Sequence, residues 1–143
     1  TIERFGRLDF LVNNAGWTTV VPHDDLDGLT DEIFRKTFEV NVFGTWWLTK
    51  AAIPHLRASD DPNIVNITSI AGVRPVGSSM AYSMTKAALN QMTLLLAKSY
   101  GPMAPVPRSA TPDDCSEAVL ALLRNRYTTG AIMVVDGGIT QVM

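Results

Sequence analysis

Two short apolar runs, each ending abruptly in polar residues, most strongly constrain what this chain can fold into. Leu8–Val12 is nearly all apolar and leads directly into Asn13-Asn14-Ala15-Gly16. Such a run is typical of a parallel strand covered on both faces. Ile64–Ile67 is a second strand-like run, which ends at Thr68-Ser69. Ligands of open α/β sheets bind at the carboxyl ends of strands, so we expect Asn13–Gly16 to border a ligand site.

The stretch from Ser69 to Lys86 combines a hydroxyl, a phenol and an ammonium group. Tyr82 and Lys86 are four residues apart in a segment that reads as a helix, which we expect to run to about Tyr100. Residues at this spacing lie on one face of a helix. An ammonium there favours the phenolate, so we expect Tyr82 to give or take a proton near neutral pH. Taken alone, the pair is also compatible with an ordinary surface helix.

A longer helix is predicted between the two apolar runs. Thr30, followed by two acidic residues, is a favourable helix start. The apolar residues between Ile33 and Leu48 exceed one face, which indicates burial against the sheet and against another subunit. Pro54 is expected to kink or weaken the last turns. Asn41 stands out, because an Asn side chain inside a helix competes for backbone hydrogen bonds.

Together these residues resemble the short-chain dehydrogenase/reductase family, in its compact branch. Asn13–Gly16 match the family's Asn-Asn-Ala-Gly, and Asn41 matches its helix-borne catalytic Asn. Ser69, Tyr82 and Lys86 match its Ser-Tyr-Lys set with the family's spacing, and Val135–Gly138 match a late Val-Asp-Gly-Gly. The resemblance covers nearly the whole chain.

The resemblance implies an α/β fold built on a doubly wound, parallel, Rossmann-like sheet in three layers. Against that fold, the chain lacks the first βαβαβ part with its glycine-rich turn, and the segment after the Tyr82 helix. We therefore expect residues 1–143 to be a single partial domain, with gaps before Thr1 and near Pro102–Ala104. The remaining segments read as a helix over Cys115–Arg124 and a final strand over Ile132–Val135.

The resemblance also implies an NAD- or NADP-dependent oxidoreductase that interconverts an alcohol and a ketone or aldehyde. Tyr82 would be the general acid or base, Ser69 would bind the substrate oxygen, and Asn41 would hold a relay water. Lys86 would assist Tyr82 and hold the nicotinamide ribose. The residues expected to bind the cofactor are Asn13, Asn14, Ala15, Gly16, Tyr82 and Lys86.

Bulk properties restrict the remaining possibilities. Hydrophobic residues make up 46% of the chain and charged residues 18%, which suits a globular domain with a core. The net charge of −2, without basic runs, gives no nucleic-acid footprint, and no apolar stretch is long enough for a membrane span. The spacing of His23 and the nearby acids fits no metal site, and the single Cys115 favours a cytoplasmic location. A homodimer or homotetramer with a small-molecule substrate is expected from the family.

Two alternatives remain open on the sequence. An extended-branch relative, such as a sugar-nucleotide epimerase or dehydratase, also uses a Tyr and a Lys four residues apart. A non-catalytic fragment that serves as a binding or oligomerisation module is favoured by the absent glycine-rich turn. The complete set of Asn41, Ser69, Tyr82 and Lys86 argues against that fragment.

Overall fold

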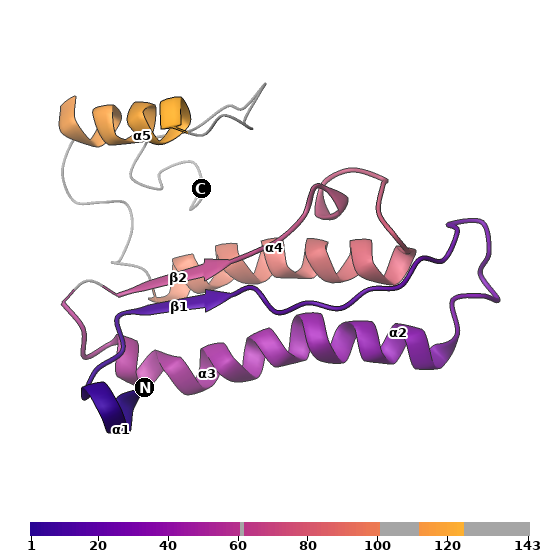
Figure 1. The fold of residues 1–143 in the computed structure, drawn as a ribbon, viewed down its shortest axis with the longest axis horizontal. Coiled ribbons are helices and arrows are strands. Elements are labelled where there is room, and N and C mark those ends of the chain that lie inside the picture. The colour runs from indigo at the N-terminus through magenta and orange to yellow at the C-terminus, as the bar shows by residue number, and fades with distance from the viewer. Residues whose placement is uncertain (61, 101–111, 125–143) are drawn as a thin grey trace. The chain divides into compact units, whose positions relative to one another are not determined.

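The computed structural model describes residues 1–60, 62–100 and 112–124 (Figure 1). The chain divides into two compact units, Thr1–Thr93 and Leu94–Met143. The predicted final strand Ile132–Val135, the motif Val135–Gly138 and the expected gap near Pro102–Ala104 lie outside the described residues.

The first unit opens with a short helix that leads into a strand. Helix α1 spans Ile2–Phe5 and ends at Gly6, whose φ of 71° is the left-handed conformation that glycine adopts without strain. Strand β1 follows over Phe10–Asn13. Just before the strand, the Arg7 guanidinium donates hydrogen bonds to the Asp9 carboxylate, which lowers the pKa of Asp9. The strand lies slightly later than the sequence indicated.

The sheet of the described residues consists of two parallel strands. Strand β2 spans Asn63–Asn66 and pairs with β1 in a register that sets Leu11 opposite Ile64 and Asn13 opposite Asn66. The predicted class, an α/β fold with a parallel sheet, is therefore confirmed at this coarse level. Because Asn13 belongs to β1, the first residue of the Asn-Asn-Ala-Gly motif is part of the sheet rather than of the turn.

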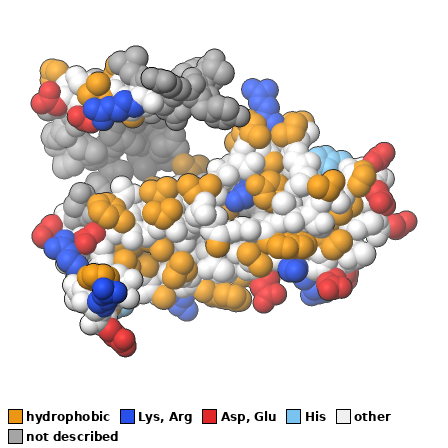
Figure 2. All heavy atoms as spheres, in the orientation of Figure 1, with side chains coloured by type: hydrophobic (Ala, Val, Ile, Leu, Met, Phe, Trp, Pro, Cys, Tyr) orange, Lys and Arg blue, Asp and Glu red, His pale blue; other side chains and the backbone are white. Residues whose placement is uncertain are grey.

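Only one face of this sheet is covered within the described residues. Leu11 packs with Ala52 and Leu56 of the helix that follows β1. The opposite face of β1 carries Phe10 and Val12, which are 61% and 58% exposed. The expectation of a strand covered on both faces is therefore wrong for β1 as the structure describes it. Figure 2 shows hydrophobic side chains over the strands and the neighbouring helix.

A nearly continuous helical segment connects the strands. It consists of α2 (Asp31–Phe38), the π-helical turn η1 (Glu39–Phe43) and α3 (Gly44–Leu56). The predicted start is confirmed, because the Thr30 side chain accepts the backbone N–H of Ile33. Helix α3 continues for two residues past Pro54. Proline mainly disturbs the turn that precedes it, and only these two residues of the helix follow it.

After β2 the chain folds closely onto a second long helix. A 3₁₀ turn, η2, spans Ile70–Gly72, and helix α4 spans Met80–Tyr100, where the sequence predicted a helix. A Cβ at Gly72 would lie 2.7 Å from the backbone carbon of Lys86, so only glycine permits this approach. Ser79 caps α4 by accepting the N–H of Tyr82.

In the second unit the described residues form the end of α4 and helix α5, Pro112–Arg124. This helix begins three residues before the predicted Cys115, because proline is well tolerated in the first turn of a helix, where its missing N–H costs nothing. Among the described residues, no helix is long and apolar enough to cross a membrane.

Candidate active site

Tyr82 and Lys86 project from the first turns of α4, as the four-residue spacing predicted. The Lys86 side chain is 5% exposed, and its ammonium donates a hydrogen bond of 2.9 Å to the Ile67 carbonyl just after β2. The same ammonium lies 5.6 Å from the centroid of the Tyr82 ring. A buried ammonium needs such partners, because burying an unpaired charge is costly. The carbonyl of Ile67 therefore fixes Lys86 beside Tyr82.

Ser69 lies between β2 and the 3₁₀ turn η2. Its Oγ accepts the backbone N–H of Ala71 at 3.1 Å and thereby caps that turn. The Ser69 oxygen therefore acts as an acceptor in this contact, and its own O–H is not used in it. Among the described residues, no acceptor is found for the Ser69 O–H.

Asn41 lies at the centre of the π-helical turn and is fully buried. Its Oδ1 accepts the backbone N–H of Trp17 at 2.7 Å, and its Nδ2 donates to the Trp17 carbonyl at 2.9 Å and to Thr85 Oγ1 at 3.0 Å. The amide thus binds both backbone groups of one residue in the loop after β1. The helix is distorted at Asn41, where a competing side chain was expected to disturb it.

Gly16 brings the loop after β1 against both of these groups. A Cβ built on Gly16 would lie 3.6 Å from Asn41 Oδ1 and 3.8 Å from Lys86 Nζ. The Asn-Asn-Ala-Gly stretch, the π-helical turn and the start of α4 therefore converge at one place. The sequence predicted this convergence only through the family resemblance, because these residues lie far apart along the chain.

Asn13 and the rest of its motif occupy different environments. The buried Asn13 Nδ2 donates to Thr49 Oγ1 of α3 at 3.2 Å and to Asn66 Oδ1 of β2 at 2.8 Å. Both of its N–H donors are engaged, so Asn13 ties the two strands to α3. Asn14, Ala15 and Gly16 are exposed at the strand end. Cofactor binding by these four residues stays a prediction.

The structure adds polar residues that the sequence did not single out. Thr85 accepts from Asn41, and Asn66 Nδ2 donates to Thr93 Oγ1 of α4 at 2.9 Å. With Thr49, these side chains form hydrogen bonds between elements that are distant in sequence. A threonine inside a helix gives no local signal of such a partner, so the sequence offered no indication of these contacts.

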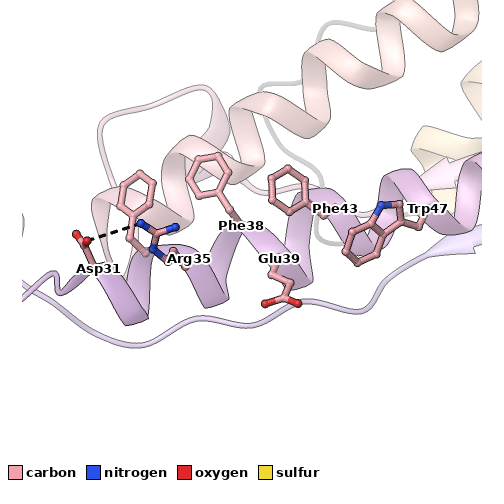
Figure 3. Close-up of a pocket in the computed structure, with 7 residues that line it drawn as sticks. Asp31, Arg35, Phe38, Glu39, Phe43 and Trp47 are labelled. Atoms are coloured by element: carbon pink, nitrogen blue, oxygen red, sulfur yellow. Dashed lines mark ion pairs between the residues drawn. The ribbon is translucent and has the colours of Figure 1, made fainter.

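A separate groove of about 620 Å³ runs along the outer side of α2, η1 and α3 (Figure 3). The labelled rings of Phe38, Phe43 and Trp47 follow one another along this helical segment. Phe34 and Phe38 stack with centroids 4.9 Å apart. The groove contains none of the predicted catalytic residues; it is lined by Asp31, Phe34, Arg35, Phe38, Glu39, Phe43 and Trp47.

No group of three potential metal ligands occurs among the described residues. His23, considered with the neighbouring acids for a metal site, has a buried Nε2 for which the described structure offers no hydrogen-bond partner. Among the predicted catalytic residues, the described contacts place Lys86 beside Tyr82, and they place both Lys86 and Asn41 beside Gly16.

Comparisons with known proteins identify the family of the chain. The family model described as short chain dehydrogenase matches residues 1–106. A relative from Streptomyces violaceoruber, by name a ketoacyl reductase of the granaticin polyketide synthase, is 40% identical over 169 residues, covering 96% of this chain and 68% of the relative. The chain belongs to the short-chain dehydrogenase/reductase family, as the sequence predicted, and its relatives are oxidoreductases.

Two further matches cover a smaller share of their proteins. The L-fucose dehydrogenase of Bos taurus is 43% identical over 97 residues, which are 68% of this chain and 35% of that enzyme. A solved short-chain dehydrogenase/reductase from Burkholderia xenovorans has a TM-score of 0.68 and 40% identity, covering 71% of this chain and 42% of that chain. The matched part is thus about two fifths of the solved relative.

Proposed function

We propose that the protein catalyses reversible hydride transfer between an alcohol and a ketone or aldehyde, with NAD or NADP as cofactor. The observation that carries this proposal is the convergence of Tyr82 and the buried Lys86 on one face of α4. The bound nicotinamide supplies or accepts the hydride. Tyr82 donates a proton to the substrate oxygen in reduction and removes it in oxidation. Ser69 donates a hydrogen bond to that oxygen and stabilises the charge that develops on it.

The residues present fit the nicotinamide half of such a cofactor. An ammonium has three N–H donors, and the bond from Lys86 to Ile67 uses one of them. The other two are suited to the hydroxyls of a ribose. A Cβ at position 16 would lie 3.8 Å from Lys86 Nζ, so the glycine found there leaves the space beside the ammonium open. The doubly wound, three-layer completion of the sheet is part of this proposal, as is cofactor contact by Asn14–Gly16.

Titration of the purified protein with NADH and with NADPH, followed by nicotinamide fluorescence, tests the proposal. We expect saturable binding with a preference for one cofactor. Turnover is then assayed with L-fucose, trans-4-hydroxycyclohexanecarboxylate and a β-ketoacyl thioester, compounds chosen from the names of relatives. Binding without any carbonyl or alcohol turnover on a broad panel would favour a non-catalytic binding module, and absence of binding would contradict the proposal.

A homodimer or homotetramer is the second part of the proposal. Large apolar side chains on η1 and α3 are exposed, among them Phe43, Trp46, Trp47 and Leu48. Contiguous exposed apolar side chains of this size mark interaction surfaces in soluble proteins. A second copy packed on this surface would bury the helix on two sides, as its sequence pattern predicts.

Trp47→Glu tests that surface. We expect the dissociation constant of the oligomer to rise at least about tenfold. The substitution places a charge where an aromatic side chain, the kind that contributes most at the centre of an interface, would be buried. Sedimentation velocity over a concentration series measures the change. Leu26→Glu is the matched control, since Leu26 is an exposed apolar residue in the loop before α2. A wild-type monomer at tens of micromolar, or an unaffected Trp47→Glu oligomer, would contradict this assignment.

A further inference from the structure

Thr85 connects two elements: the turn of α4 that contains Tyr82 and the π-helical turn η1. Its side chain is fully buried. The hydroxyl donates to the Tyr82 carbonyl at 2.7 Å and accepts from Asn41 Nδ2 at 3.0 Å. Both hydrogen-bonding functions of the hydroxyl are therefore engaged, one within α4 and one with a residue 44 positions away.

The contact continues from Asn41 to the loop after β1. The two N–H groups of Asn41 Nδ2 go to Thr85 and to the Trp17 carbonyl, while Oδ1 takes the Trp17 N–H. Exchange of the amide oxygen and nitrogen would set donors against donors, so the orientation of the amide is fixed. A chain of hydrogen bonds thus runs from the Trp17 backbone through Asn41 and Thr85 to Tyr82.

We propose that Thr85 is a positioning residue for hydride transfer, a role that rests on the proposed function. The Thr85 proton points at a backbone carbonyl, which does not carry a proton onward, so Thr85 acts by holding its neighbours. Thr85, the residue directly before Lys86, holds Asn41 and the Trp17 loop against the turn that contains Tyr82. Loss of the hydroxyl leaves a buried N–H of Asn41 without a partner. It also removes the contact that holds Asn41 in place relative to the turn with Tyr82.

The test compares Thr85→Val, Thr85→Ser and Thr37→Val. Thr37 is the matched control, because it is equally buried but, among the described residues, its hydroxyl bonds only the Ile33 carbonyl of its own helix. With the best substrate of the panel above, we expect Thr85→Val to lower kcat about 10- to 100-fold, as small displacements of reacting groups do. KM for the cofactor should stay within about twofold, and Thr85→Ser and Thr37→Val should stay near wild-type kcat.

Amide hydrogen exchange of the peptide containing Trp17 is the second readout. Thr85→Val should accelerate exchange of the Trp17 N–H, because its acceptor Asn41 loses one anchor, whereas Thr37→Val should not. An active wild type with unchanged kcat in Thr85→Val, no rescue by Thr85→Ser, or unchanged exchange overturns the positioning role alone. A wild type that turns over nothing on the panel overturns the proposed function, and the positioning role with it.

Discussion

Tyr82→Phe is expected to reduce turnover by about 10²- to 10⁴-fold, the range associated with loss of a general acid or base. The substitution removes one oxygen and keeps the ring that lies 5.6 Å from the Lys86 ammonium. Cofactor affinity and the unfolding midpoint should therefore change little. Steady-state kinetics with the best substrate, together with cofactor titration by nicotinamide fluorescence, separates the chemical step from binding.

Tyr100→Phe provides the matched control for this experiment. Tyr100 is the last residue of α4, at the opposite end of the helix from Tyr82. The same chemical change there should leave kcat near the wild-type value. A Tyr82→Phe protein with substantial turnover would contradict the acid/base role, and equal losses in both variants would point to a general effect on α4.

Most secondary elements were predictable because their signals are local. The cap at Thr30, the left-handed Gly6 and the length of α4 depend on neighbouring residues only. The 3₁₀ turn at Ile70–Gly72 was not predicted, since three residues carry no periodicity and the turn depends on close approach of Gly72 to α4. The early start of α5 shows the same limit, because helix ends depend on context.

The candidate site divides in a similar way. Tyr82 and Lys86 could be placed on one helix face from their spacing, whereas the approach of Asn41 and Gly16 requires contacts between distant segments. The family resemblance assigned these residues to one site, but it predicted no contact between Asn41 and Gly16. Thr85 was not predicted at all, because its position in the sequence suits any polar helical residue. Its importance depends on the hydrogen bond from Asn41, a residue distant in sequence.

Asn13 illustrates how one motif can combine two physical roles. Its amide donates to Thr49 and Asn66, whereas the next residue of the motif, Asn14, is exposed. Bracing therefore belongs to Asn13, and any ligand contact by side chains of the motif falls to the residues after it. Substitution of each Asn separates these roles by measurement.

Asn13→Ala is expected to lower the free energy of unfolding by about 2–3 kcal/mol, because it removes two hydrogen bonds and leaves buried polar groups unpaired. Asn14→Ala, the matched control, should change it by less than about 0.5 kcal/mol, the usual range for a surface substitution. Urea denaturation followed by circular dichroism measures both values. Equal stability of the two variants would contradict the bracing role. If Asn14→Ala also weakens cofactor binding without loss of stability, the exposed part of the motif faces the cofactor.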